Sequence, residues 1–521
     1  MHNLKKFIQN HHSFFFALGL GIILLVGAYL RLYNISGYMT FLGDEGRDVL
    51  VVKRMIVDHK FTLLGPTASV GGFFLGPIYY YFMLPFLLLW RLDPTGPAVM
   101  VALFGIATIY LVYRVGRDFF DEWVGFIASS LYAVSPLVIA YSRSSWNPNL
   151  VPFFATLLMY VLWNIVVKKH WSQLFWVGVI FGIGLQLHYL FTFLFVVVAL
   201  WFFIFGRSLQ YVKYYAFGIA GFLLGYASFL AFEVRHGFPN TMSVIRFVVA
   251  GKDTGLHMGF FQTIGDVVFR LFGRLVFRLP QPELWSSFPL WQRQIWEVGI
   301  TGSIILAVFI LLRFIFHKRL VALGDRQKAS VLFILWLVAT IVLFGLYRKA
   351  IYDYYFGIFF ALPFLLVGLI LSQLSLVRFG KFVVIGIWIG LLYFNWQGRP
   401  FLYPPNNQLA QARRIAMTAL AKTEGKPFNF ALITGQNSDH VYRYFFEISG
   451  NAPVTIENVE KDPQRTTVTD QLIVICEYYE CKPLGHPLWE IAGFGKAQIV
   501  GQWDVPFVKI IKLVHLSENK K

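Results

Sequence analysis

The residues that could perform chemistry gather first in the stretch GDEGRD, residues 43–48, just past an almost wholly apolar run. If Asp44 begins a helix that continues to residue 58, its carboxylate can cap that helix, and Arg47 follows one turn later. A carboxylate that accepts a proton, beside a cation and a helix N-terminus that attract anions, suits a reaction in which a phosphate departs. The alternative is structural: Asp44 only caps an interfacial helix, and Arg47 extends to lipid headgroups.

Further polar residues interrupt or flank the apolar runs. They lie in the segments YSRSSWNPN, LQLHYLFTF, FEVRHGFPN and LYRKAIYDYYF. A charge at mid-membrane costs about 2.5–3.5 kcal/mol, so we expect these charged residues at an interface or in a polar cavity. Each also has a structural alternative, because interfacial anchoring, a hydrogen-bonded histidine between spans or an aromatic belt would explain it. The candidates are Arg143, His188, Tyr189, Glu233, Arg235, His236, Arg348, Lys349 and Asp353.

The composition is that of an integral membrane protein. Of the 521 residues, 57% are hydrophobic and only 14% are charged, and the mean hydropathy is +0.60. These values lie outside the range of soluble domains. The formal net charge of +18 is typical of basic cytoplasmic loops that attract anionic lipids, so we expect a membrane and no nucleic acid as partner.

Twelve apolar stretches are candidate spans. Basic loops, best marked by residues 317–328, indicate which loops are cytoplasmic, and Lys5 and Lys6 place the N-terminus there as well. That assignment leaves one crossing too many. The stretch 74–90 contains two prolines, so we expect it to be re-entrant or interfacial, which leaves eleven crossings. The stretches are 14–32, 74–90, 97–115, 124–141, 150–167, 174–187, 190–205, 216–232, 297–316, 331–346, 355–371 and 383–396.

The chain divides into two predicted domains. Residues 1–398 form a polytopic all-α membrane bundle, multi-pass in the cell (inner or plasma) membrane, with external loops at 33–73 and 233–296. Residues 399–521 are less hydrophobic and combine a helical stretch with the apolar runs FNFALIT, QLIVICE and FVKIIKLV. This pattern predicts a small extracytoplasmic α/β domain.

Several catalytic signatures are absent from the sequence, among them a Walker loop, a dinucleotide fingerprint, a zinc-binding HExxH helix and a GxSxG elbow. We therefore expect no soluble nucleotide as co-substrate. Cys476 and Cys481 either form a disulfide or remain free thiols, and a metal site with His486 lacks further ligands. The sequence predicts no metal ligands and leaves a divalent cation open as a cofactor.

The order of these motifs resembles a known family. LGDEGRD in the first external loop, then FFLGPIYYYFMLPFLLL, YSRSSWNPN and YDYYFGIFFALPFLL are similar to the GT-C clan of polyprenyl-phosphate-sugar-dependent glycosyltransferases. Within the clan the chain resembles the group of protein O-mannosyltransferases and aminoarabinose transferases. The resemblance covers about residues 14–396. It implies a sugar transfer from a polyprenyl-phosphate-linked donor lipid to an extracytoplasmic hydroxyl of a lipid, glycan or protein acceptor, with inversion at the sugar.

The resemblance also implies roles for individual residues. Asp44 would be the catalytic base, Glu45 would support it, and Arg47 would bind the donor phosphate. Many relatives carry a lysine before the proline where this chain reads Leu75-Gly76-Pro77, so another cation must take that part. The candidates for the donor phosphate are Arg143, Arg235, His236, Arg348 and Lys349, and those for the substrate are His188, Tyr189, Glu233 and Asp353.

Two other classes of function compete with this hypothesis. In a transporter or flippase of lipid-linked sugars, the same charges would line a path. Transporters, however, often place polar groups at mid-membrane, whereas these charges gather at one face. A structural scaffold would not explain the GDEGRD stretch.

Overall fold

The computed structural model describes residues 12–516 except 69–70, 250–253, 257, 281, 317–323, 436 and 479. Most of the predicted cytoplasmic marker 317–328 therefore lies outside the described residues. The chain forms two compact units. Unit 1 comprises residues 1–33, 62–82 and 98–404, and unit 2 comprises residues 34–61, 83–97 and 405–521. The predicted domain division at residue 398 stays a prediction, and each unit is described by itself.

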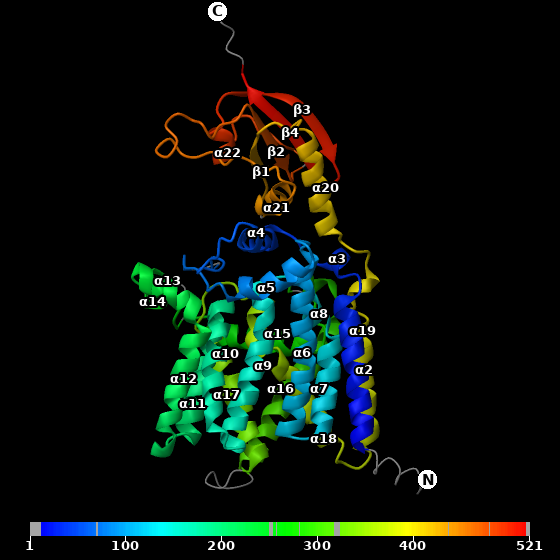
Figure 1. Ribbon diagram of the computed structural model, residues 1–521. Helices are drawn as coiled ribbons and strands as arrows, with labels where there is room; N and C mark the ends of the chain where they lie inside the picture. Colours follow the sequence, from blue (N-terminus) through cyan, green and yellow to red (C-terminus); the bar gives the residue numbers. More distant parts are fainter. Residues whose placement is uncertain are drawn as a thin grey trace, which may run out of the picture. The chain divides into compact units, whose positions relative to one another are not determined.

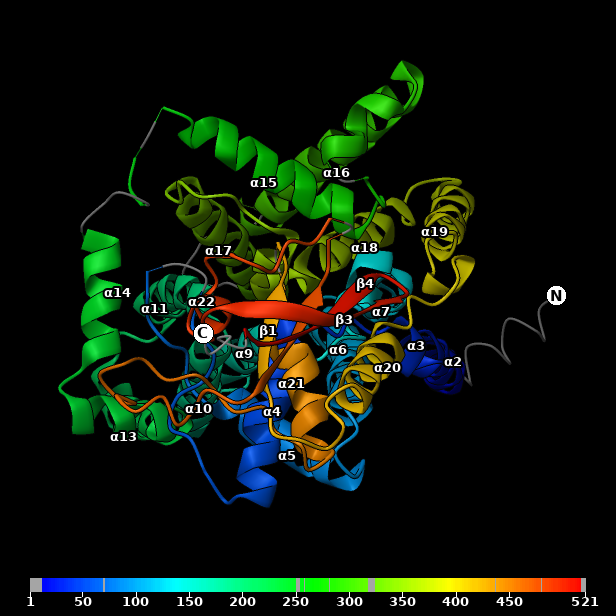
Figure 2. The ribbon, with the colours of Figure 1, turned by 90° about the horizontal axis from the view of Figure 1, so that it is seen from above.

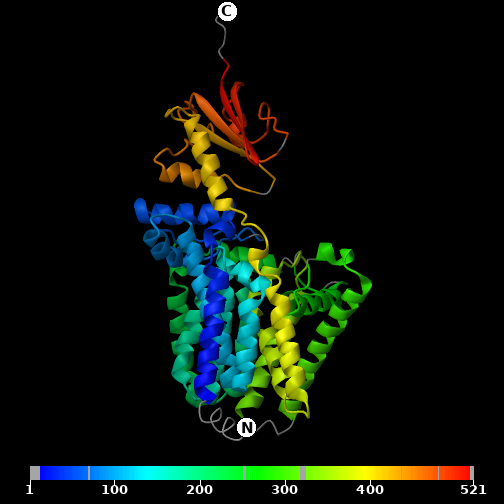
Figure 3. The same cartoon turned by 90° about the vertical axis from the view of Figure 1, so that its right-hand side faces the viewer.

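Unit 1 is a bundle of apolar helices whose axes are roughly aligned, as those of α2 (blue) and α19 (yellow) are in Figure 3. Five described helical stretches are long and apolar enough to cross a membrane, and two bent helix pairs raise the number to seven. Runs of apolar residues form helices here because a helix satisfies every backbone polar group within itself. The five are α2 (His12–Leu32), α6 (Thr95–Phe119), η1 with α9 (Asn147–Leu150 and Val151–Val167), α16 (Leu290–Phe316) and α17 (Asp325–Gly345).

The bent pairs and four shorter apolar helices complete this group. One pair is α12 (Val212–Gly225) with α13 (Ala227–His236), bent by 77°. The other is η7 (Asp353–Phe359) with α18 (Ala361–Leu374), bent by 60°. The described helices thus support a bundle with several spans, and the number of eleven crossings stays a prediction. The shorter helices include α5 (Ile78–Leu89), α10 (Leu174–Leu187), α11 (Phe193–Phe205) and α19 (Gly380–Trp396).

The predicted long external loop 233–296 contains helices. It holds the end of α13, then α14 (Pro239–Val249), α15 (Phe260–Leu275) and the start of α16. Viewed along the bundle, α14 and α15 are seen side-on, whereas α6 and α9 are seen end-on (Figure 2). One face of α15 is apolar and buried, and the helix contacts α16, α17 and α18. It is therefore an amphipathic helix that lies across the bundle rather than along it.

Unit 2 contains a four-stranded sheet of order β1-β2-β4-β3. β1 (Asn429–Ile433) and β2 (Gln471–Cys476) are parallel, and β4 (Val508–His515) is antiparallel to β2 and to β3 (Ala497–Val505). β1 and β2 are buried along their whole length, as expected for parallel strands covered on both faces. The predicted small α/β fold of this region is confirmed.

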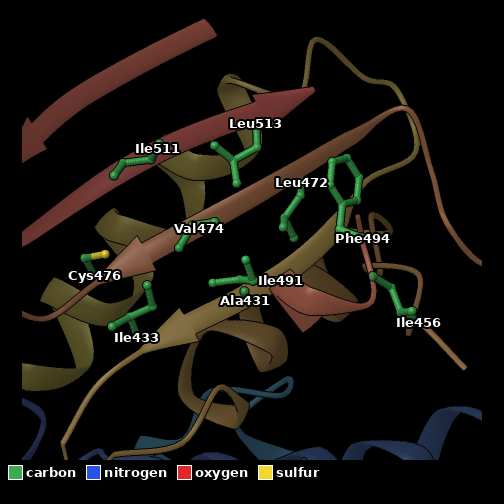
Figure 4. Close-up of a cluster of buried hydrophobic side chains, with 10 residues drawn as sticks. All are labelled: Ala431, Ile433, Ile456, Leu472, Val474, Cys476, Ile491, Phe494, Ile511 and Leu513. Carbon is green, nitrogen blue, oxygen red and sulfur yellow. The ribbon is translucent and has the colours of Figure 1, made fainter. Parts of the chain in front are cut away.

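One face of this sheet carries the core drawn in Figure 4. Side chains of β1, β2 and β4 pack there with Ile491 of α22 (Trp489–Ala492) and with Phe494. On the other face, Phe430 of β1 packs edge-on against Phe446 of α21 (His440–Ile448). α20 (Gln408–Ala421) packs beside α21. Cys476 and Cys481 form a disulfide, which decides between the two alternatives of the sequence analysis.

Part of the predicted first external loop, residues 33–73, folds in unit 2. Its helices are α3 (Ile35–Tyr38) and α4 (Gly43–Val57), and α4 packs along α21 (Figure 1). The backbone N–H of Phe41 donates to Gln408 Oε1 over 3.0 Å, and the Phe41 ring packs against Phe445. The helix that carries the GDEGRD stretch therefore packs against the C-terminal part of the chain.

Candidate functional site

The helix that carries the GDEGRD stretch is capped two residues earlier than predicted. Its N-cap is Leu42, which is extended, and Asp44 lies in the first turn without a capping hydrogen bond. Glu45 caps the helix instead, because its Oε2 accepts the Leu42 N–H over 3.0 Å. The predicted capping role of Asp44 is wrong, and its carboxylate is free of that task.

Asp44, Arg47 and Asp48 form a charged group that we call the α4 triad. The Arg47 guanidinium donates to Asp44 Oδ1 over 2.9 Å and to Asp48 Oδ1 over 2.8 and 2.9 Å. Asp48 is fully buried, whereas the Asp44 side chain is 54% exposed. A single cation thus holds two carboxylates, and the outer one remains accessible to a substrate.

The α4 triad bears on the role of Arg47 as a phosphate ligand, which stays a prediction. The resemblance implies a phosphate ligand, but the guanidinium is engaged by two carboxylates of its own helix. Asp48 was not among the predicted site residues. It lies four residues after Asp44, on the same helical face, and this spacing was the signal that could have identified it.

Glu45 lies next to the α4 triad and is buried, with 6% of its surface exposed. The pKa of its carboxyl is raised to about 7, chiefly by burial; the hydrogen bond from Leu42 opposes this rise, and the charges of Asp44 and Asp48 add to it. Glu45 therefore titrates near neutral pH. Its predicted supporting role stays a prediction, to which the structure adds the capping of α4.

Two glycines place α4 on α21. A Cβ atom on Gly46 would lie 2.6 Å from the Val441 backbone nitrogen, and a Cβ atom on Gly43 would meet Ser438. Only glycine allows such an approach of two backbones. At the far end of α4, Arg54 and Lys53 pair with Glu447 of α21, over 2.5 and 3.6 Å.

Unit 1 contains a second charged group, which we call the α15 arginine pair. Arg270 Nη2 and Arg274 Nε, one turn apart on α15, bind the two oxygens of Asp353 over 2.7 and 2.8 Å. All three side chains are 12–14% exposed. Asp266, which is half exposed, pairs with Arg270 over 3.1 Å. Asp353 was a predicted substrate ligand, whereas the sequence analysis missed both arginines.

Asp353 begins η7, and the same segment carries part of an aromatic cluster. The Tyr189 hydroxyl lies 3.3 Å from that of Tyr355 and 3.4 Å from that of Tyr347. His188 is buried and stacks on Tyr189, and its Nδ1 accepts the Leu190 N–H over 3.2 Å. His188 thus caps η3 (Tyr189–Thr192). The roles of His188 and Tyr189 in substrate binding stay predictions.

Glu233 has a structural role. It is buried at the end of α13, and its two oxygens accept hydrogen bonds from the backbone and side chains of Asn240 and Thr241 over 2.7–3.3 Å. These bonds cap the N-terminus of α14. A substrate-binding role for Glu233, which stays a prediction, would have to use the same oxygens. Arg235 and His236 are exposed on α13, and His236 stacks on Phe232.

Two of the remaining predicted phosphate ligands, Arg143 and Arg348, donate to backbone carbonyls. Arg143 is buried and donates to the carbonyls of Leu30 and Tyr33 over 2.7 and 2.8 Å. It therefore binds the C-terminal end of α2, where a cation is favoured. Arg348 and Lys349 are exposed, and Arg348 donates to the Leu256 carbonyl over 2.7 Å.

The structure thus brings the predicted residues together only in part. Asp44, Glu45 and Arg47 lie on one helix of unit 2, whereas the other candidates belong to unit 1. Within the described part of the chain, no three His, Cys, Asp or Glu side chains form a group that could hold a metal. His486 Nδ1 accepts the Leu488 N–H.

Part of the chain matches a protein-family model, and the fold is similar to that of solved structures. Residues 76–232 match the family model described as dolichyl-phosphate-mannose-protein mannosyltransferase. The fold is similar to that of ArnT from Cupriavidus metallidurans bound to undecaprenyl phosphate, with a TM-score of 0.61, 11% identity and coverage of 95% of this chain and 97% of that one. The predicted resemblance to GT-C glycosyltransferases is confirmed. No curated protein sequence matches the chain.

Two further structures of this GT-C group bear out the likeness. ArnT in the apo state gives a TM-score of 0.59 at 12% identity, with coverage of 96% of this chain and 98% of that one. The archaeal oligosaccharyltransferase AglB from Archaeoglobus fulgidus, in complex with an inhibitory peptide and a dolichol-phosphate, gives 0.50 at 14% identity, with coverage of 89% and 70%. The chain therefore has the multi-pass membrane fold of these proteins.

Proposed function

We propose that this protein is a membrane glycosyltransferase that moves a sugar from a polyprenyl-phosphate-linked donor to a hydroxyl group of a lipid, glycan or protein acceptor outside the cytoplasm. The observation that carries the proposal is the accessible Asp44 carboxylate, held by Arg47 at the start of α4. The matched family model and the ArnT-like fold support it. The ArnT and AglB structures bound to polyprenyl phosphates support the class of donor.

Asp44 acts as the general base in this reaction. Its carboxylate removes the proton of the acceptor hydroxyl, the hydroxyl oxygen bonds to the anomeric carbon, and the bond from that carbon to the phosphate oxygen breaks. The polyprenyl phosphate leaves as an anion. Arg47 and Asp48 are positioning residues, because the guanidinium that binds Asp44 is itself fixed by the buried Asp48.

The α15 arginine pair holds the departing phosphate. Two largely buried guanidinium groups share one largely buried carboxylate, Asp353, and the second acid, Asp266, is half exposed to solvent, so the buried part of the group retains positive charge for an anion. The α4 triad has no such excess, since its single arginine, Arg47, is bound by two acids. We therefore assign the phosphate to Arg270 and Arg274, with the exposed Arg348 and Lys349 as further candidates.

The topology completes the proposal. We infer eleven crossings of the cell membrane, with a cytoplasmic N-terminus and with the loop that carries Asp44 and the C-terminal region outside. The basic loops of the sequence support this orientation. The transferred sugar is a hexose or a pentose.

The test uses detergent-solubilised full-length protein and a labelled polyprenyl-phosphate-sugar donor. The proposal expects release of free polyprenyl phosphate by the wild type and its loss in Asp44→Asn. Asp504→Asn is the matched control, because the Asp504 side chain is 85% exposed on β3. A transporter or flippase of lipid-linked sugars would leave the donor intact, and equal release by wild type and Asp44→Asn would refute the role of Asp44.

A further inference from the structure

A groove of about 740 Å³ runs along α10, α11 and α12 in unit 1. Glycine explains its shape. A Cβ atom on Gly178 of α10 would collide with the Gly218 carbonyl of α12, so these two helices touch backbone to backbone. α11 packs instead against α9 and α17, which leaves the groove between the side chains of the three helices. The helices lie at the margin of the bundle in Figure 1.

The walls of the groove are apolar over most of its length. Phe181, Phe195 and Phe222 line one part, and Phe203 and Gly206 line the other. Along α11 the lining extends from residue 195 to residue 206, a rise of about 16 Å. One leaflet contributes half of a hydrocarbon core of about 30 Å. The groove is thus about as long as one leaflet is deep.

The polar groups of the groove are concentrated at one end. The Arg207 guanidinium stacks on the Phe203 ring at 3.7 Å and donates to the Phe203 carbonyl. Ser208 lies next to it in the lining, and the Tyr215 hydroxyl donates to the Gly206 carbonyl. Between residues 168 and 232 the sequence contains four basic residues, which are Lys168, Lys169, Arg207 and Lys213, and no acidic residue.

We propose that this groove binds one anionic phospholipid, with an acyl chain along the apolar walls and the phosphate at Arg207. The charge of this end favours an anion, and the depth of the groove suits a lipid of one leaflet. A peptide would leave its backbone polar groups without partners against these walls. The proposal goes beyond sugar transfer and does not depend on it.

Native mass spectrometry of the full-length protein in detergent tests the proposal. The probes are phosphatidylglycerol and phosphatidylcholine with identical acyl chains, added after delipidation. We expect the wild type to retain one phosphatidylglycerol at least about fivefold more than phosphatidylcholine. Arg207→Gln should remove this preference. Arg313→Gln is the matched control, because Arg313 lies in the last turn of α16 and is exposed.

A second variant tests the apolar part of the groove. A Cβ atom on Gly218 would lie 3.5 Å from its nearest neighbour, the Leu174 carbonyl, which is an ordinary contact. Gly218→Leu should therefore fold and fill the groove, and lower the retention of both lipids several-fold. In the control Gly302→Leu, on α16, a Cβ atom would have no neighbour within 4 Å, and retention should be unchanged.

Three outcomes would overturn the proposal. The first is equal retention of the two lipids by the wild type, and the second is unchanged preference in Arg207→Gln. The third is that Gly218→Leu lowers the retention of a polyprenyl phosphate and not that of a phospholipid. Because this experiment measures lipid retention and not sugar transfer, failure of the proposed glycosyltransferase activity would leave its result unaffected.

Discussion

The α4 triad and the α15 arginine pair use the same kinds of side chain in different proportions. On α4, one arginine binds two aspartates, and the outer aspartate is half exposed. On α15, two arginines bind one aspartate, Asp353, and all three are largely buried, while a second aspartate, Asp266, pairs with Arg270 and is half exposed. The first group therefore has an excess of negative charge and can accept a proton. The second has an excess of positive charge among its buried side chains and can hold an anion.

The largest expected effect comes from removing the proton acceptor. Asp44→Asn should lower kcat for the release of polyprenyl phosphate by about 10²- to 10⁴-fold, because general base catalysis contributes this much. Binding of the donor lipid should persist, since the phosphate ligands are intact. Single-turnover kinetics with labelled donor measure the rate, and a variant that also fails to bind donor would contradict the division of roles.

The next largest effect is expected from removing the two arginines that hold the phosphate. Arg270→Gln with Arg274→Gln should weaken donor binding and lower kcat/KM by about 10²- to 10³-fold, because two charged donors to the phosphate are removed. The control Arg378→Gln replaces an exposed arginine that packs on Phe379. Titration with the unreactive product, polyprenyl phosphate, measures the binding step, and wild-type affinity in the double variant would remove the α15 arginine pair from the mechanism.

Arg47 sharpens the comparison, because the sequence and the structure suggest different roles for it. If it positions Asp44, Arg47→Gln lowers kcat by about 10- to 100-fold and leaves the KM for the donor unchanged. Arg47→Lys should recover part of the loss, since an ammonium still reaches one carboxylate. If instead the KM for the donor rises and kcat stays, Arg47 binds the phosphate as the family resemblance implies.

The smallest effect on activity is expected from Glu45, whose titration makes the local stability of α4 depend on pH. Its folded-state pKa is about 7, raised by burial from an ordinary value of 4.5. A carboxyl with a raised pKa stabilises the folded state at low pH, and this contribution is lost as the pH rises from about 4.5 to about 7.

We therefore expect the local stability of α4 to fall by up to roughly 3 kcal/mol across this range. Amide hydrogen exchange of α4, corrected for the intrinsic rate, measures the fall. Glu45→Gln keeps an acceptor for the Leu42 N–H and should flatten the profile. An equally steep profile in that variant would assign the effect to another group.

Much of the fold could be predicted from runs and periods in the sequence. Long apolar runs predicted α2, α6, α16 and α17, and short ones predicted β1, β2 and β4. β3 was missed because a register shift between Ile499 and Gly501 interrupts it, so polar and apolar residues alternate only over residues 502–505. α15 was missed because it lies within a stretch interpreted as a loop.

The candidate site was harder to predict, because its pairs join distant parts of the chain. The GDEGRD stretch identified Asp44 by residue type and place. Nothing local indicates that Arg270 and Arg274 meet Asp353, some eighty residues later. In the same way, Arg143 looked like a phosphate ligand in sequence, and only the fold brings it to the carbonyls that end α2.

The glycine contacts of α4 have a consequence for protein engineering. Because Gly43 and Gly46 lie against the backbone around residues 438–441, the location of the Asp44 carboxylate depends on main chain encoded almost four hundred residues later. A chimera that exchanges the C-terminal region for that of a relative would then shift the base itself. Altered acceptor choice in such a hybrid would reflect a displaced reaction centre as much as a new binding surface.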